Sequence, residues 1–230
     1  MQTRILATIT VPNTPSITAA IAYTREQVAP QTFNHVMRSW LIGMASVSRL
    51  PTSLTSSLDL EAFAVAAILH DLGWSHNADL VTHDKRFEVD GANAARAFLL
   101  EQGWDVDRAQ KVWDAIVLHT IPSIAAHASL LTALVSTGVM TELASPDVTR
   151  DMFGPDLVQA TQDEWEAINR DFPREGLKGH LNETLIGLCR SKPEGVYGTW
   201  VAGYGEKFLG GEGWVDKRKG VDLIEGLTRE

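Results

Sequence analysis

The sequence predicts an all-α protein built as a single-domain helical bundle with an irregular C-terminal segment. Apolar residues recur at intervals of three and four along most of the 230-residue chain, as in helices that bury one face. Strand signals are weak, because apolar and polar residues rarely alternate and no Asn-Gly or Asp-Gly pair separates two β-rich runs. No Gly-, Pro- or Ser-rich linker divides the chain, so one domain is expected.

Seven helices are expected before residue 173. Pro15 favours the start of the first helix, Gly103 the end of the fourth and Asp105 the start of the fifth. The third helix is apolar almost all round, as a central buried helix would be. The expected ranges are 15–29, 32–50, 59–71, 88–103, 105–120, 128–144 and 155–172. Beyond them, one further helix and irregular, aromatic-rich structure are expected.

Composition argues against several kinds of partner. The formal charge is −9, and no Lys/Arg cluster precedes "DKRKG" near the C-terminus, so neither a nucleic-acid surface nor a basic face for anionic membranes is expected. No apolar stretch approaches the roughly 18 residues that a membrane-spanning helix needs. Cys189 is the only cysteine, which fits a reducing, cytoplasmic location. A small-molecule substrate is therefore the expected partner, and a homo-oligomer is left open.

Ionisable residues occur where four of the expected helices should be apolar. His70 and Asp71 end the apolar run "AAILHDLGW", His35 lies between Phe33 and Met37, His119 ends "VWDAIVLHT", and Glu142 lies in "TGVMTEL". Buried charges are costly unless they are paired or coordinate a metal. Helical bundles build metal sites from His and carboxylate side chains that point inward. The pattern therefore predicts one divalent metal ion bound among these helices.

Each of these residues also has a structural interpretation when taken alone. His35 can be a hydrogen-bonded core histidine, and His70 can complement the dipole at a helix C-terminus. Asp71 can cap a turn, His119 can act as His70 does, and Glu142 can be a surface charge. Spacing and pattern leave the metal site and these structural roles open as alternatives.

Several motifs carry a resemblance to a known family. The segments "FNHVMRSW", "AAILHDLGW", "RFEVDGANAARAFL", "IVLHT" and "CRSKPEGVYGTW…YGEKF" resemble the HD superfamily of metal-dependent hydrolases, and most closely its cyanamide-hydratase-like branch. The resemblance implies an all-helical HD domain over residues 31–210. An N-terminal helical segment over 1–30 would pack on its core, and a tail over 211–230 would follow.

The resemblance also implies a single metal, zinc in cyanamide hydratase, held by His, His-Asp and a later Asp. Carried over, these ligands are His35, His70 and Asp71, while Glu142 stands in the position of the later Asp and Ser145 in that of the family Gly. Three outcomes are open: Glu142 binds the metal, three ligands and water bind it, or the metal and the activity are lost. We expect the first outcome. Iron would also accept these ligands.

Further residues within the shared motifs are expected to serve the reaction. The residues expected to contact substrate are Asn34, Arg38, Trp74 and His119, and those expected to take part in catalysis are Asp71, His119 and Glu88. Glu88 is expected to orient a metal-bound imidazole, with a structural ion pair to Arg86 as the alternative. His119 is expected to contact substrate or transfer a proton, and Asp71 to guide the water proton.

The expected function is metal-assisted addition of water to a small carbon–nitrogen substrate such as a nitrile or cyanamide, which would yield urea from cyanamide. One alternative is an HD phosphohydrolase acting on a nucleotide or small phosphate ester, for which Arg38, Lys85 and Arg86 are the nearby cations. A second alternative is a metal-free scaffold that binds a small ligand, and Glu142 in place of the family Asp favours it.

Overall fold

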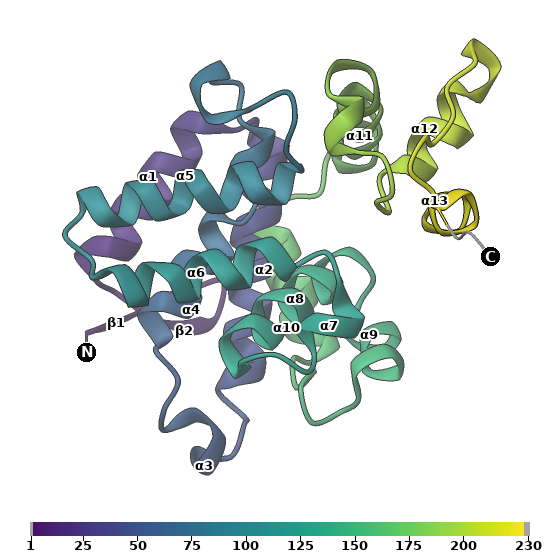
Figure 1. The fold of residues 1–230 in the computed structure, drawn as a ribbon. Coiled ribbons are helices and arrows are strands. Elements are labelled where there is room, and N and C mark those ends of the chain that lie inside the picture. Colours follow the sequence, from purple (N-terminus) through teal and green to yellow (C-terminus); the bar gives the residue numbers. More distant parts are fainter. Residues whose placement is uncertain (1, 228–230) are drawn as a thin grey trace. The chain divides into compact units, whose positions relative to one another are not determined.

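The computed structural model describes residues 2–227 and confirms the all-α fold class. The described residues form 13 α-helices, four short 3-10 helices and one two-stranded sheet (Figure 1). Two compact units contain them. The first unit comprises the residues up to 81 together with 87–175, and the second comprises 82–86 together with the described residues from 176 onward.

The first unit contains β1 and β2 and ten α-helices among its described residues. Their bounds are β1 (Thr3–Leu6), β2 (Ile9–Pro12), α1 (Pro15–Gln27), α2 (Pro30–Val47), α3 (Thr52–Thr55), α4 (Leu60–Leu69), α5 (Phe87–Glu101), α6 (Val106–Leu118), α7 (Pro122–Ala125), α8 (Leu130–Leu143), α9 (Pro146–Phe153) and α10 (Gln162–Asp171). Two 3-10 helices, η1 (Leu72–Trp74) and η2 (Ala78–Leu80), follow α4. Helices were expected at α1, α2, α4, α5, α6 and α8, and the structure confirms these six.

Helix α4 forms the centre of this unit. It packs against α1, α2, α6 and α8 (Figure 1), and every residue from Ala62 to Leu69 is buried. The Asp59 side chain accepts a hydrogen bond from the Ala62 backbone N–H, which defines the helix start. The expectation of a central helix that is apolar all round is therefore confirmed.

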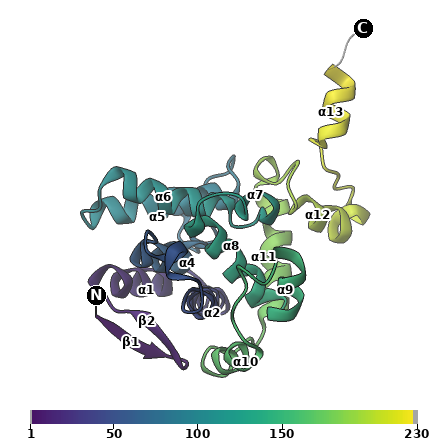
Figure 2. The same ribbon diagram turned by 90° about the horizontal axis from the view of Figure 1, so that it is seen from below.

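The N-terminal segment over 1–30, expected to be helical, contains a β-hairpin before its helix α1. Strands β1 and β2 pair antiparallel, with Leu6 opposite Ile9, and the hairpin contacts α2 through β2 (Figure 2). The turn residues Ala7 and Thr8 have φ values of 44° and 72°. A two-residue hairpin turn with positive φ at both positions usually carries Asn-Gly or Asp-Gly. The sequence lacks that signal, which is why the hairpin was not expected.

The region after α8 also differs from expectation. A helix was expected over 155–172, but α10 begins only at Gln162, and a separate helix, α9, precedes it. The start of α10 is fixed by a capping box, in which the Thr161 hydroxyl accepts from the Glu164 backbone N–H and the Glu164 carboxylate accepts from that of Thr161. Local capping therefore decides this boundary.

The second unit is more regular than expected. It contains α11 (Leu177–Ser191), η3 (Pro193–Gly195), α12 (Ala202–Leu209), η4 (Gly210–Glu212) and α13 (Gly220–Leu227). One helix and irregular structure were expected here, and the structure adds α12 and α13 to the single helix. Residues 228–230 of the expected tail lie outside the described residues.

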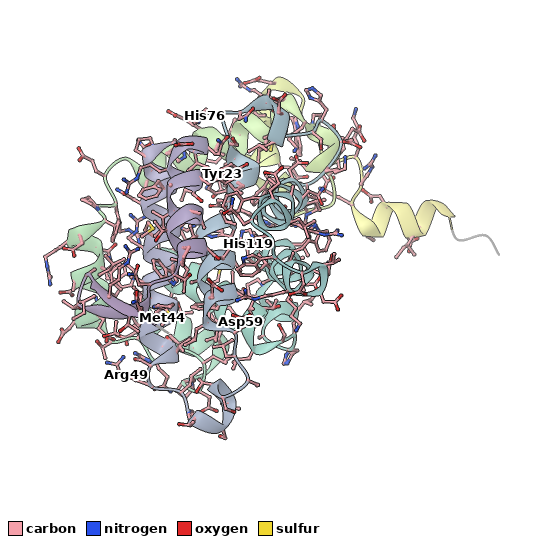
Figure 3. All side chains as sticks on the ribbon, turned by 90° about the vertical axis from the view of Figure 1, so that its left-hand side faces the viewer. Tyr23, Met44, Arg49, Asp59, His76 and His119 are labelled. Atoms are coloured by element: carbon pink, nitrogen blue, oxygen red, sulfur yellow. The ribbon has the colours of Figure 1, made fainter. Side chains whose placement is uncertain are left out.

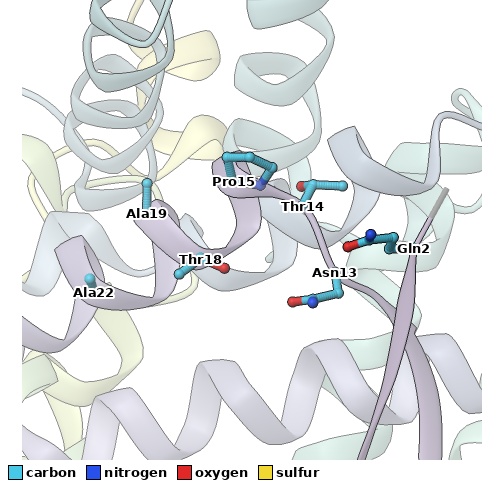
Figure 4. A pocket seen from close by; sticks show the side chains of 7 residues that line it. All are labelled: Gln2, Asn13, Thr14, Pro15, Thr18, Ala19 and Ala22. Atoms are coloured by element: carbon cyan, nitrogen blue, oxygen red, sulfur yellow. The ribbon is translucent and has the colours of Figure 1, made fainter.

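An open hollow of about 510 Å³ lies along the first turns of α1 (Figure 4). Gln2, Asn13 and Thr18 line it with four other residues, none of which has an ionisable side chain. This hollow therefore offers neither metal ligands nor acid–base groups.

Among the described residues, no helix combines the length and the apolar character needed to cross a membrane.

Candidate metal centre

His70 and Asp71 lie at the end of α4, where the chain leaves the helix for η1. Their exposed fractions are 0% and 1%. Gly73, in the turn that follows, has no space for a side chain, because a Cβ atom there would lie 1.9 Å from the Phe87 carbonyl oxygen. The glycine therefore allows η1 to pack directly on the start of α5, which holds His70 and Asp71 inside the unit.

A second close approach joins α2 to α8. A Cβ atom on Gly138 would lie 2.6 Å from the Ser39 carbonyl oxygen, so only glycine permits this contact between the two helices. Residues four positions apart share one face of a helix. His35 on α2 and Glu142 on α8, each four residues from this contact, are thereby brought together.

Three imidazole nitrogens surround the Asp71 carboxylate. His70 Nε2 and His35 Nε2 lie 3.4 Å and 3.5 Å from Asp71 Oδ2, and His119 Nε2 lies 3.7 Å from Asp71 Oδ1. The Nε2 atoms of His35 and His70 are 3.3 Å apart. Ligand atoms of His35, His70 and Asp71 all lie within 4.8 Å of one another. These three residues form a cluster able to hold a metal ion.

The other nitrogen of each ring is already engaged. His70 Nδ1 lies 2.8 Å from the Ala67 carbonyl oxygen, and His119 Nδ1 lies 2.6 Å from that of Ile116. A carbonyl oxygen only accepts, so Nδ1 carries the proton in both rings and Nε2 of the neutral ring is an acceptor. His35 Nδ1 lies 2.6 Å from Glu142 Oε2, which gives His35 the same tautomer.

The chemistry of these atoms fits a cation. Both oxygens of Asp71 are buried and have no hydrogen-bond partner among the described residues. When the rings are neutral, the Nε2 atoms facing them are acceptors as well, and acceptors brought together without a donor repel one another. Burying such groups is costly unless a positive charge lies between them. A divalent metal at His35, His70 and Asp71 would supply it.

Electrostatics set the protonation of two groups in this cluster. Burial disfavours the ionised form of Asp71, but the charges of His70, His35 and His119 outweigh it and lower the Asp71 pKa to about 2. Burial, reinforced by repulsion from His70, lowers the His119 pKa to about 4. Near neutral pH, Asp71 is therefore ionised and His119 is neutral.

Glu142 is fully buried beside this cluster but binds other groups. Its Oε2 accepts from His35 Nδ1, and its Oε1 accepts from Arg38 Nε at 2.6 Å and from Arg174 Nη1 at 2.8 Å. Burial opposes its ionisation, yet His35, Arg38 and Arg174 lower the Glu142 pKa to about 2. Glu142 was expected to be a fourth ligand, and in the structure its carboxylate lies against the Nδ1 edge of the His35 ring.

His119 and Glu88 lie on neighbouring helices. The His119 backbone carbonyl accepts from Ser136 Oγ at 2.9 Å, and the ring centroids of His119 and His70 are 4.7 Å apart. His119, labelled in Figure 3, is 2% exposed. Glu88 is also buried and accepts a 2.6 Å hydrogen bond from Thr120 Oγ1, and its charge acts on His119. The structure thus places Glu88 within electrostatic range of the site.

The remaining expected substrate contacts fall in different places. Asn34 Nδ2 donates to the Pro173 carbonyl oxygen at 3.1 Å. Asn34 also lines a hollow of about 320 Å³ that includes none of the three cluster residues. Trp74 is half-buried, and its Nε1 is buried without a hydrogen-bond partner among the described residues. Arg38 Nη2 and Trp74 Nε1 both lack a hydrogen-bond partner among the described residues, but the Arg38 side chain is held by other bonds.

Arg174 is the residue at this centre that the sequence analysis missed. It lies in "FPREG", 32 residues beyond Glu142, with no local pattern that links the two. A buried carboxylate on the apolar helix α8 implies a cationic partner. That argument predicts an arginine or lysine, but only the fold identifies Arg174.

Comparison with known proteins agrees with this geometry. The HD domain family matches residues 32–152, more than half of the 230-residue chain, and the chain belongs to this family. A search of curated proteins found no match. The matched region contains His35, His70, Asp71 and Glu142. Family membership and the cluster together identify a metal-dependent hydrolase in general terms, with a small molecule as its substrate.

Proposed function

We propose that this chain is a metal-dependent hydratase or hydrolase that adds water to a small carbon–nitrogen substrate such as a nitrile or cyanamide. The observation that carries the proposal is the Asp71 carboxylate, which is buried, has no hydrogen-bond partner among the described residues and faces the Nε2 atoms of three histidines. Resemblance of "AAILHDLGW" and "RFEVDGANAARAFL" to cyanamide-hydratase-like proteins supports the substrate class.

His35, His70 and Asp71 would hold the metal. A bound divalent ion, zinc or iron, would lower the pKa of water toward about 7 and would polarise a carbon–nitrogen group as a Lewis acid. The chain's part in this is to fix three ligand atoms before the ion arrives. The Ala67 carbonyl and Glu142 do this for His70 and His35 by binding their Nδ1 atoms.

Asp71 and His119 are placed to handle protons. His119 Nε2 is unprotonated in the neutral ring and lies 3.7 Å from Asp71 Oδ1, so a water molecule beside the pair could give a proton to either group. The Ile116 carbonyl keeps the accepting nitrogen of His119 directed at Asp71. Glu88, through its charge, favours the protonated form of His119 and so assists this transfer.

The polar groups around the cluster favour an uncharged substrate. Arg38 and Arg174, the guanidinium groups next to it, are engaged by Glu142 and by backbone carbonyls. Trp74 Nε1 is a neutral donor without a partner among the described residues, and it could donate to a nitrile or amide nitrogen or oxygen. The ring of Phe87, 5.2 Å from that of Trp74, adds apolar surface.

A phosphate ester is the second candidate substrate, and Arg38 is the observation in its favour. Arg38 is 0% exposed and its Nη2 has no partner among the described residues. A buried guanidinium N–H could bind a phosphate oxygen. A nitrile or amide would thus use the neutral donor Trp74 Nε1, whereas a phosphate ester would use the cationic donor Arg38 Nη2.

A substrate panel with metal analysis tests the proposal. Purified protein is expected to carry about one equivalent of transition metal and to hydrate cyanamide or a small nitrile, with no phosphate released from nucleotides. The His70→Ala variant should lose turnover and metal while keeping its helical far-UV circular dichroism. Phosphate release would favour the alternative substrate, whereas protein that neither carries nor binds metal would leave only a metal-free scaffold.

A further inference from the structure

We infer that Glu142 positions the metal ligand His35 and does not itself bind the metal, and that Arg38 and Arg174 hold Glu142 in this role. The inference rests on the proposed metal centre. It assigns to Glu142 a task different from that of the Asp whose position it takes in the resemblance. The protein would then hold its metal through His35, His70 and Asp71 alone.

The orientation of the His35 ring supports a positioning role for Glu142. Glu142 Oε2 lies 2.6 Å from Nδ1, on the edge of the ring opposite the Nε2 atom that faces Asp71 and His70. A carboxylate that accepts from one nitrogen of an imidazole fixes the ring and makes the other nitrogen a better ligand. Glu142 therefore improves His35 as a ligand from the position it already occupies.

Three side-chain donors have the Glu142 carboxylate as their hydrogen-bond acceptor. Its Oε1 accepts from both Arg38 Nε and Arg174 Nη1, and Arg174 Nη1 also donates to the Glu142 backbone carbonyl. Arg38 and Glu142 are both 0% exposed. If Glu142 turned to the metal, the buried Nδ1–H of His35 and the buried Nε–H of Arg38 would lose their acceptor. Unpaired buried donors of this kind are strongly disfavoured.

The connection between α10 and α11 also helps to hold Arg38 and Arg174 in place. Arg38 Nη1 donates to the carbonyl oxygens of Phe172 and Pro173, each at 3.0 Å, and Arg174 Nη2 donates to that of Leu143 at 3.3 Å. Arg38 is thereby fixed by backbone atoms beyond α10, and Arg174 by the backbone of α8 at Glu142 and Leu143. These bonds hold the two guanidinium groups against the Glu142 carboxylate.

The net charge of the clamp formed by Arg38, Glu142 and Arg174 also argues against Glu142 as a metal ligand. Two guanidinium groups surround one carboxylate, so the Arg38–Glu142–Arg174 group has a formal excess of one positive charge. Moving the carboxylate toward a cation would leave the buried Arg38 guanidinium facing a like charge on the part-exposed Arg174. The extra methylene of glutamate, compared with aspartate, allows the carboxylate to reach His35 Nδ1 and Arg38 together.

Arg174 offers the sharpest test, because the two roles of Glu142 predict opposite signs. If Glu142 positions His35, Arg174→Met loosens the clamp and lowers zinc affinity, by up to the roughly 10- to 100-fold that outer groups contribute. If Glu142 were a ligand, the same change would free its carboxylate and raise zinc affinity. Arg49→Met is the matched control, because Arg49 pairs with Glu164 on a part-exposed surface. It should leave zinc affinity unchanged.

A second measurement follows the His35 proton by nuclear magnetic resonance. A hydrogen-bonded Nδ1–H of His35 is expected at low field in zinc-free protein, absent in Glu142→Ala and retained after zinc is added. Loss of this signal on zinc addition, or a rise in zinc affinity in Arg174→Met, would overturn the inference. Wild-type protein that binds no zinc while keeping the proton signal would instead overturn the proposed function.

Discussion

The two ends of α4 each carry an aspartate, and the two carboxylates differ in their hydrogen-bond partners. Asp59, labelled in Figure 3, accepts from the Ala62 N–H at 3.0 Å and from two nitrogens of Arg108 at 2.6 Å and 2.9 Å. Asp71 is 1% exposed and has no hydrogen-bond partner among the described residues. Asp59 is thus matched by donors of the fold itself, whereas Asp71 is faced only by histidine Nε2 atoms at 3.4–3.7 Å among the described residues.

The surroundings of the two aspartates show the same contrast. Arg108 also pairs with Glu61 at 2.7 Å and lies 3.6 Å from the centre of the Trp104 ring, so donors and acceptors are matched at the start of α4. At the end of α4, acceptor atoms of His70 and His119 face an acceptor. An excess of unmatched acceptors in a buried cluster thus distinguishes a ligand-binding site from a structural network.

The largest expected effect comes from changing Asp71. Asp71→Asn keeps the shape of the side chain but removes the charge, so zinc affinity should fall by about 100-fold or more and turnover should be lost. Zinc titration against a competing chelator measures the change. Asp59→Asn is the matched control on the same helix and should bind zinc like the wild type. Equal zinc affinity in the two variants would break the comparison.

Zinc should stabilise the fold by binding at the Asp71 end of α4 and not at the Asp59 end. A ligand that binds only the folded state adds about 2.7 kcal/mol at a concentration of about 100 times its Kd. Urea unfolding with and without zinc should show this gain in the wild type and in Asp59→Asn. Asp71→Asn should show none, and a gain there would mean that zinc binds elsewhere on the chain.

The Asp59 end should matter for stability alone. Asp59→Ala removes the cap and the pair with Arg108, and should lower the free energy of unfolding by about 1–2 kcal/mol. Asp59→Asn keeps a capping oxygen and should cost less, because a part-exposed ion pair contributes at most about 1 kcal/mol. Urea unfolding of both variants separates the cap from the ion pair. A change in zinc affinity in either variant would contradict this assignment.

The sequence predicted the parts of the site that depend on local pattern. His35, His70 and Asp71 were identified as polar residues on otherwise apolar helices, and the structure brings their ligand atoms within 4.8 Å of one another. The central position of α4 also followed from its apolar character all round. Periodicity and short motifs report which face of a helix is buried, and this determines most of the bundle.

Pairings between distant segments could not be predicted. Arg174 and Glu142 meet because the connection after α10 returns to α8, which no local pattern encodes. The turn at Ala7 and Thr8 has no glycine or asparagine, so its hairpin left no signal. The capping box of Thr161 and Glu164, in contrast, was readable in the sequence and would have placed the start of α10 correctly.

The smallest expected effect concerns Ser145, three residues beyond Glu142. Its φ of 149° and ψ of 165° belong to a region that is essentially restricted to glycine, and its side chain makes no capping hydrogen bond. Ser145→Gly relieves strain worth about 1–3 kcal/mol but adds roughly 0.5–1 kcal/mol of backbone entropy cost. A net gain of about 1 kcal/mol in the free energy of unfolding is expected.

The zinc affinity of Ser145→Gly tests whether the strain at Ser145 affects the metal centre or only the stability of the fold. The Ser145 carbonyl accepts from Thr149 Oγ1 at 2.7 Å, a bond that glycine preserves, so α9 should begin as before. Glu142 is held by His35, Arg38 and Arg174, none of which contacts the Ser145 side chain in any hydrogen bond described above. Zinc affinity should therefore stay within about twofold of the wild type, because the substitution removes none of the hydrogen bonds that hold the Glu142 carboxylate. A more stable variant with clearly weaker zinc binding would instead place the strain in the service of the metal centre.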